Sequence, residues 1–106
     1  MASYRVDFEA MGWQSPAAGV RFKAFADAAR RVRLVEFSEG FHEADWCRGG
    51  HIGMVLQGRC EVDFDGQVIA FGPGDGVFIP PGEPHRHKAR VVEGPVRVVL
   101  VEDEPG

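Results

Sequence analysis

Apolar and polar side chains alternate along much of the chain, the pattern of β-strands that bury one face and expose the other. Val20, Phe22 and Ala24 fall on one face of a predicted strand, and residues 32–37 predict a second strand of the same kind. The intervening residues 27–30 are too few to form a stable helix on their own. These segments therefore predict a β-hairpin.

The centre of the chain predicts a second hairpin. Residues 60–64 alternate apolar and charged side chains and lead into the pair Asp65-Gly66, a dipeptide that favours a two-residue hairpin turn. Residues 67–71 supply the returning strand. This is the strongest turn signal in the chain, and it indicates antiparallel pairing of the two segments.

Several further short segments have strand character and are separated by breaks that contain glycine or proline. They are residues 4–8, 52–56, 76–79, 84–92 and 95–101. Residues 11–16 are expected to form a loop. About nine or ten short strands at such close spacing, without a predicted helix, indicate an all-β sandwich or barrel.

The composition fits one compact domain. The chain has 106 residues, of which 44% are hydrophobic, and it contains 14 Gly and 7 Pro. So many turn-forming residues favour short segments over long helices. No apolar run approaches the ~20 residues that span a bilayer, so no membrane association is expected.

Charge and cysteine content limit the expected surroundings and partners. The formal net charge is −4, which argues against nucleic acid as a partner. The first residues lack the apolar segment of a secretory signal, so the expected compartment is the cytoplasm. In that reducing environment Cys47 and Cys60 are expected to be thiols, with a metal, catalytic or core role rather than a disulfide.

Residues 74–85 contain glycines, a proline and a histidine at the spacing G-x5-P-x-G-x2-H. The matching positions are Gly74, Pro80, Gly82 and His85. This spacing resembles the second signature of the cupin superfamily, although Ala89 stands where that signature ends in Asn. The resemblance implies an all-β fold, the double-stranded β-helix or jelly-roll β-barrel of small RmlC-like cupins.

The resemblance also implies how the chain is organised. Residues 1–106 are expected to form a single cupin domain, with the barrel core at residues 45–101 and N-terminal strands within residues 1–40. Small cupins commonly form homodimers, and an open sheet edge needs cover, so a homodimer paired through sheet edges is expected.

The first cupin signature, which supplies two His and a Glu as metal ligands, is matched in part. Counting back from its closing glycine places His51 where the family carries its metal-binding Glu. The same count puts the family's two His at Asp45 and Cys47, or at Ala44 and Trp46 in the longer register. The resemblance therefore implies a metal site whose ligand set is altered.

Five potential metal ligands are expected to converge inside the barrel. If the segment that carries Asp45, Cys47 and His51 stays near extended, all three project to one face. The same interior face is expected to receive His85 and His87, two residues apart. The leading hypothesis takes His51, His85 and Cys47 as ligands, with His87 or Asp45 as a fourth ligand or a hydrogen-bonding partner.

The donor types favour a divalent transition metal. Imidazole and thiolate together suit zinc, iron, nickel or copper. Two His with the carboxylate of Asp45 would instead form the facial triad of non-haem iron oxygenases. The expected cofactor is therefore a divalent ion such as zinc, iron, nickel or manganese.

Each of these residues also has a purely structural alternative. Free cysteines such as Cys47 are commonly small buried hydrophobes, and a barrel histidine such as His85 is commonly held by hydrogen bonds. Loop carboxylates such as Asp45 and Glu43 are usually solvated. A bulge at the glycine pair 49–50 would change the phase of the strand and turn Cys47 or Asp45 outward.

Three functions are compatible with this ligand set. The resemblance implies a small-molecule ligand in the barrel and, for a metal with an open position, a dioxygenase, isomerase or lyase reaction, with no catalytic residue assigned. A closed four-ligand site would instead suit a non-catalytic metal-binding or sensor protein. A metal-free cupin whose pocket histidines bind an organic anion is the third alternative.

Overall fold

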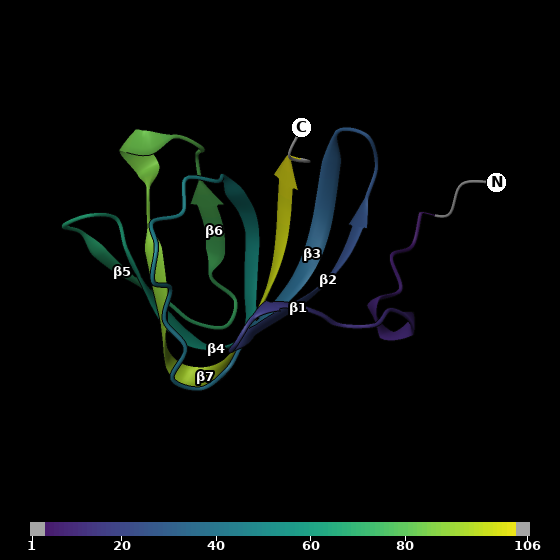
Figure 1. Cartoon of the computed structure of the whole chain (residues 1–106), viewed down its shortest axis with the longest axis horizontal. Coiled ribbons are helices and arrows are strands. Elements are labelled where there is room, and N and C mark those ends of the chain that lie inside the picture. Colours follow the sequence, from purple (N-terminus) through teal and green to yellow (C-terminus); the bar gives the residue numbers. More distant parts are fainter. Residues whose placement is uncertain (1–3, 104–106) are drawn as a thin grey trace.

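The computed structural model describes residues 4–103, which form a curled antiparallel sheet of seven strands (Figure 1). The strands are β1 (Gln14–Ala17), β2 (Val20–Ala26), β3 (Arg30–Phe37), β4 (His51–Asp63), β5 (Val68–Phe71), β6 (Gly76–Ile79) and β7 (Lys88–Asp103). Two short 3-10 helices, η1 (Phe8–Ala10) and η2 (Glu83–His85), lie before β1 and before β7. No helix in the described part of the chain is long and apolar enough to cross a membrane.

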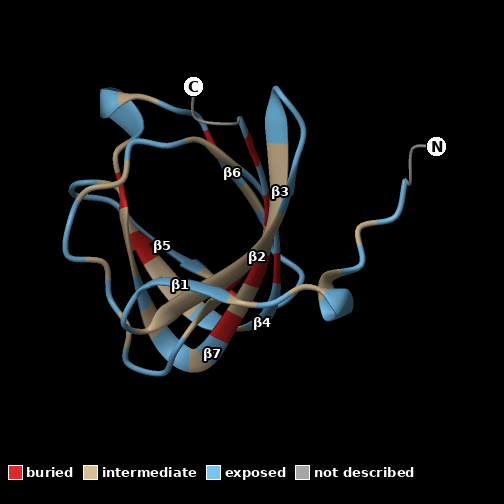
Figure 2. Cartoon of the chain, turned by 45° about the vertical axis from the view of Figure 1, so that its right-hand side comes forward, coloured by how far each residue is buried: buried red, intermediate tan, exposed pale blue. Residues whose placement is uncertain are grey.

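The long strands β4 and β7 form the centre of the sheet, whose order is β1-β2-β3-β7-β4-β5, with β6 also paired to β4. Residues 52–55 of β4 pair with residues 98–101 of β7, and residues 60–63 pair with residues 88–91. The register shifts between residues 55 and 60, and bulges of this kind bend a strand. The sheet therefore curls into a jelly-roll barrel (Figure 1, Figure 2), which confirms the predicted all-β fold.

The strands are fewer and longer than the sequence predicts. The predicted segments 52–56 and 60–64 belong to the single strand β4, and the segments 84–92 and 95–101 merge into β7 after η2. Gly58 and Gly94, at the two expected breaks, lie within the bent strands β4 and β7 and do not end them. Two N-terminal predictions are wrong, because residues 4–8 are not a strand and β1 begins inside the predicted loop.

The interior of the barrel is lined by one side of the alternating pattern. Val35, Val55, Val98 and Leu100 are buried and form a single cluster. In Figure 2 the buried positions appear as short red stretches separated by more exposed ones along the strands. The period of two predicted for residues 32–37 and 60–64 is therefore confirmed on β3 and β4, and burial along the second half of β7 alternates in the same way.

The outward face of the sheet is polar at one end. Arg21, Glu36 and Arg97 are cross-strand neighbours on β2, β3 and β7. Arg21 Nε and Arg97 Nε donate hydrogen bonds to Glu36 at 2.8 and 2.7 Å. The ring of Trp13 covers this row, with the guanidinium carbon of Arg21 4.0 Å from the ring centroid. Cation–π contacts thereby hold the N-terminal segment against the sheet.

Gly58 allows β4 and β7 to approach closely where they bend. Its φ is +80°, in the left-handed region that favours glycine. A Cβ atom placed on Gly58 would lie 2.4 Å from the backbone oxygen of Pro95 and 2.8 Å from that of Glu93. Since these oxygens belong to a paired strand, a side chain at this position would push the two strands apart.

Glu36 should make the stability of the fold depend on acid pH. Burial raises the pKa of this carboxyl, but the hydrogen bonds from Arg97 and Arg21 outweigh burial and hold the pKa below its usual value. The ion pairs therefore stabilise the fold above the ordinary pKa near 4.5, and this contribution is lost as the pH falls further. We expect Glu36→Gln to lower the free energy of unfolding by about 1 kcal/mol at neutral pH, and by less in acid, in urea denaturation. An equal difference at both pH values would contradict this role of Glu36.

Gly58→Ala should destabilise the fold by roughly 3 kcal/mol, through left-handed strain and through overlap with β7. Gly40→Ala is the matched control, because Gly40 has nearly the same φ, +79°, and no atom lies within 4 Å of an added Cβ. The control should lose only about 1 kcal/mol, the cost of the left-handed backbone. Urea unfolding measures both variants, and equal losses would exclude the close approach as the cause.

Candidate metal centre

Three side chains with metal-ligating atoms meet at one point of the barrel. The ligand atoms of Cys47, His51 and His87 all lie within 4.8 Å of one another. His87 is buried, and Cys47 and His51 are partly buried. His87 comes from a distant part of the sequence, so the fold brings it to the other two.

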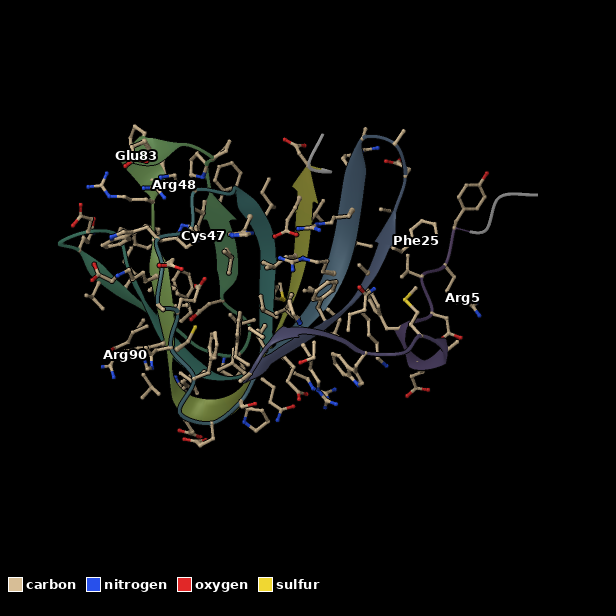
Figure 3. All side chains as sticks on the ribbon, viewed as in Figure 1. Arg5, Phe25, Cys47, Arg48, Glu83 and Arg90 are labelled. Atoms are coloured by element: carbon tan, nitrogen blue, oxygen red, sulfur yellow. The ribbon has the colours of Figure 1, made fainter. Side chains whose placement is uncertain are left out.

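Backbone pairing places Cys47 beside His87. The two residues form an isolated β-bridge outside the regular strands. The N–H of Cys47 donates to the carbonyl of His87 at 2.8 Å, and the N–H of His87 donates to the carbonyl of Cys47 at 2.9 Å. His51 begins β4, and its Nε2 lies 3.6 Å from the sulfur of Cys47. In Figure 3, Cys47 lies within the ring of strands, whereas Arg48 lies near η2 and pairs with Glu83.

Each imidazole is held through its Nδ1 atom. His51 Nδ1 lies 2.5 Å from Glu102 Oε2, and His87 Nδ1 lies 3.1 Å from the carbonyl oxygen of His85. Because a carbonyl oxygen only accepts hydrogen bonds, His87 Nδ1 carries the hydrogen and Nε2 is left as the ligand atom. Metal-binding histidines are commonly oriented in this way, by a carboxylate or a carbonyl on the nitrogen that does not bind the metal.

Glu102 is fixed in turn by two arginines of β3. Arg33 donates from Nε and Nη2 to the two carboxylate oxygens at 2.6 and 2.7 Å, and Arg31 Nε adds a third hydrogen bond at 3.0 Å. Burial raises the pKa of Glu102, but the hydrogen bonds from His51 and Arg33 outweigh burial and bring the pKa to about 2. Glu102 is therefore a carboxylate at neutral pH, and it holds the ring of His51 in place.

The charges of Cys47 and His51 depend on each other. Hydrogen bonds with His51 and His87 lower the pKa of the Cys47 thiol to about 5. Burial lowers the pKa of His51, but the contacts with Cys47 and Glu102 raise it more, to about 9. At neutral pH the sulfur is thus a thiolate, which is the form that binds metal ions, and His51 is a cation whose Nε2 proton an incoming ion would displace.

Two of the predicted ligands lie outside this group. Asp45 lies in a bend and is exposed, and His85 is the last residue of η2 and is also exposed. The expected alternation fails at both places, because the bend and the 3-10 turn interrupt the extended backbone that would carry these residues inward. His85 contributes its carbonyl oxygen, which orients His87. The geometry therefore does not support Asp45 and His85 as ligands.

Two glutamates that the sequence analysis did not assign belong to the site. Glu43 lines the interior cavity and accepts a hydrogen bond from the N–H of Ala89 at 3.0 Å, and burial raises its pKa. Glu102 continues the inward row of Val98 and Leu100 along β7. A charged residue within such a buried row needs a partner, and this is the signal that would have identified Glu102.

The centre lies between two spaces. On the inner side is a cavity of about 170 Å³, whose walls are mostly aliphatic and aromatic and which also contains Glu43 and His87. On the outer side is a groove of about 770 Å³, lined by the arginines of β3 and by apolar residues of β4, β6 and β7. Cys47 and His51 line both spaces. An ion held here would face the cavity on one side and the groove on the other.

One thiolate and two imidazoles form a donor set that suits zinc and other late first-row transition metals. Within residues 4–103 the group has three ligands, whereas structural zinc sites have four. Three protein ligands leave a coordination position for water or for an atom of a substrate, as in catalytic zinc sites. An ion held by these three residues would supply Lewis-acid chemistry, toward an oxygen atom of a substrate or toward water.

Known structures share this fold. KdgF from Halomonas sp. superposes with a TM-score of 0.80 at 24% sequence identity, covering 100% of this chain and 96% of that one. An RmlC-like cupin from Shewanella frigidimarina gives a TM-score of 0.80 at 17% identity, covering 98% and 93%. A sugar phosphate isomerase of the cupin superfamily from Silicibacter pomeroyi gives 0.76 at 17% identity, covering 95% and 76%. No curated protein matches the sequence.

A family model described as Cupin domain matches residues 35–102, which is more than half of the chain. The matched stretch contains all three clustered ligands and Glu102. It also contains residues 74–85, whose spacing of glycine, proline and histidine resembles a cupin signature. The chain therefore belongs to the cupin family.

Proposed function

We propose that the protein binds one divalent transition metal ion through Cys47 Sγ, His51 Nε2 and His87 Nε2. The observation that carries this proposal is the convergence of the three ligand atoms within 4.8 Å of one another. Both imidazoles are already held at Nδ1, so neither ring has to reorient when the ion binds. The thiolate favours zinc, iron or nickel over manganese.

The open coordination position supports catalysis on a small molecule. A bound ion would act as a Lewis acid toward an oxygen atom of the substrate or toward water. Glu43 is placed to hold or move a proton, because it faces the cavity and burial raises its pKa. Isomerase and lyase reactions fit this combination of a Lewis-acid ion and a proton-carrying carboxyl, and a dioxygenase reaction would in addition require a redox-active ion such as iron or nickel.

The cavity favours a small, mainly apolar substrate that turns one oxygen-bearing group toward the ion. Its walls are aliphatic and aromatic apart from the ligands, the cysteines, Glu43 and Arg33. Arg33 already donates two hydrogen bonds to Glu102. The cavity therefore has few free groups that could bind a phosphate group. In this respect it does not suit a sugar phosphate, the substrate that the name of the Silicibacter pomeroyi isomerase gives for that protein.

A non-catalytic metal-binding or sensor function is the second candidate. The thiolate of Cys47 favours it, since cysteine is the commonest ligand of closed structural zinc sites. A closed site needs four protein ligands, and the described residues bring three together. X-ray absorption spectroscopy of the metal-loaded protein distinguishes the two functions through the coordination number and the presence of a bound water.

A pair of histidine variants tests the metal site. Protein without a histidine tag should contain about one equivalent of metal per chain after reconstitution and dialysis. His87→Ala should lose most of this metal because it removes a ligand, whereas His85→Ala should keep it because only the carbonyl of His85 contacts the centre. Elemental analysis measures the content of each variant.

Cobalt substitution tests whether the sulfur of Cys47 is a metal ligand. The wild type should display the charge-transfer absorption of a cobalt thiolate, and Cys47→Ala should abolish it. Loss of metal from His85→Ala with retention in His87→Ala would overturn the ligand set. A wild type that takes up no metal would overturn the metal site as a whole and would favour a cupin that binds an organic ligand alone.

Glu102 is proposed as a positioning residue for His51. Glu102→Gln should weaken metal binding by about 10- to 100-fold, because the ring loses its fixed orientation. Glu36→Gln is the matched control, since Glu36 is also a largely buried carboxylate held by two arginines, but on the outward face. The control should keep the wild-type affinity in competition with a chelator. Equal losses in both variants would assign the effect to general destabilisation.

A further inference from the structure

The inward row of β3 changes from apolar to basic toward the start of the strand. Val35 is buried in the barrel, and Arg33 and Arg31 occupy the alternate positions on the same face. Arg30 is the first residue of the strand. All three arginines line the outer groove. In Figure 1 the start of β3 lies at the same end of the barrel as the last residues of β6 and β7, so the groove opens at this end.

One of these arginines is enough to pair with Glu102. Arg33 donates to both carboxylate oxygens at 2.6 and 2.7 Å, which is the two-pronged contact that a guanidinium makes with a carboxylate. Arg31 donates to the same carboxylate from Nε alone, at 3.0 Å. Among residues 4–103 the two Nη groups of Arg31 have no hydrogen-bond acceptor. The guanidinium of Arg31 therefore keeps donors for a further anion.

Arg30 adds a second guanidinium with unused donors. Its side chain is exposed, and it makes no hydrogen bond or salt bridge within the part of the chain that the structure describes. The carboxylate of Asp27 feels the charge of Arg30, but its hydrogen bonds come from the backbone N–H groups of Ala29 and Arg30. The guanidinium of Arg30 is thus able to bind a molecule in the groove.

The described side chains that line the groove carry an excess of one positive charge. Three arginines face two carboxylates, those of Glu102 and Asp103. Cys47 and His51 add no net charge, because either both are neutral or they carry opposite charges. The groove is therefore suited to a ligand with a single negative charge.

Apolar side chains line the groove beside the arginines. They are Ile52 of β4, Phe78 of β6 and Val101 of β7. Phe78 is 75% exposed, so its ring is accessible to a ligand. The groove has a volume of about 770 Å³, which lies within the range of small-molecule sites. A place for one negative charge next to an apolar wall suits a small organic acid.

We propose that the outer groove binds the carboxylate of a small organic acid, with Arg31 and Arg30 as its hydrogen-bond donors. The planar guanidinium offers two parallel N–H groups that match the two oxygens of a carboxylate. A phosphate monoester would bring about two negative charges, which exceeds the single positive charge that the groove offers. The formal net charge of −4 disfavours polyanions such as nucleic acids.

This site names the class of substrate, and it rests on the proposed function only for the statement that the bound acid is a substrate. Cys47 and His51 line both the groove and the inner cavity. An acid held by Arg31 would therefore share the groove with two of the candidate ligands. Arg31 would bind the acid directly, whereas Arg33 acts through Glu102 as a positioning residue.

Binding of small acids and of their neutral amides to the full chain tests the proposal. The probes are benzoate, phenylacetate and hexanoate, each compared with its amide, in NMR titrations of the zinc-loaded protein and of the protein without metal. At least one acid should bind about 10-fold or more tightly than its amide in both forms, because the amide carries no charge for the guanidinium groups. Binding to the protein without metal separates this site from the candidate metal centre.

Variants of the arginines locate the carboxylate. Arg31→Ala should weaken the binding of that acid about 10-fold or more, leave the binding of its amide unchanged, and keep the zinc, since Arg33 still holds Glu102. Arg30→Ala should weaken the acid as well, and its exposed position makes it the second variant if Arg31→Ala does not fold. Arg21→Ala is the matched control and should bind like the wild type. Arg21 Nε also donates to a largely buried glutamate, Glu36, at 2.8 Å, but Arg21 does not line the groove.

Several results would overturn the carboxylate site. One is the absence of any preference for an acid over its amide, and another is an acid affinity that stays unchanged in both groove variants. An acid that binds only the zinc-loaded protein, and binds Arg31→Ala and Arg30→Ala as tightly as the wild type, would assign the carboxylate to the ion. A chain that takes up no zinc but still prefers the acid would support this site and contradict the proposed metal function alone.

Discussion

The antiparallel pairing of β4 with β7 is the interaction on which both the barrel and the candidate metal centre depend. His51 begins β4 and Glu102 lies near the end of β7, and the register of the two strands brings His51 Nδ1 within 2.5 Å of Glu102 Oε2. His87 directly precedes β7 and pairs with Cys47. Because side chains alternate along a strand, a shift of one residue between the strands would turn Glu102 outward. The same register therefore closes the core and orients the ligands.

The sequence predicts the barrel from two independent signals that agree. Period-two alternation identifies inward positions such as Val62, and the spacing of residues 74–85 identifies the family. The number of strands is overestimated because Gly58 suggests an end where the backbone only bends. Sequence spacing does not distinguish a glycine that terminates a strand from one that lets two strands approach. The cytoplasmic location stays a prediction.

The geometric group of candidate ligands contains three of the five predicted residues, and the placement of the other two has a local cause. Cys47, His51 and His87 belong to the five predicted ligands and meet in the structure. Asp45 and His85 were included on the assumption of an extended backbone, and a bend and a 3-10 turn break that assumption. Such single turns depend on the packing around them, so they do not appear in the spacing of the ligands alone.

The bridge between Cys47 and His87 consists of backbone hydrogen bonds at 2.8 and 2.9 Å. These hydrogen bonds require no particular side chain at either position, so the donor type there can change while the bridge itself is kept. The backbone contacts that place these two residues side by side are thus independent of the donor atoms that their side chains carry. A single substitution at Cys47 or His87 would therefore change the donor set of the candidate centre without removing a hydrogen bond of the bridge.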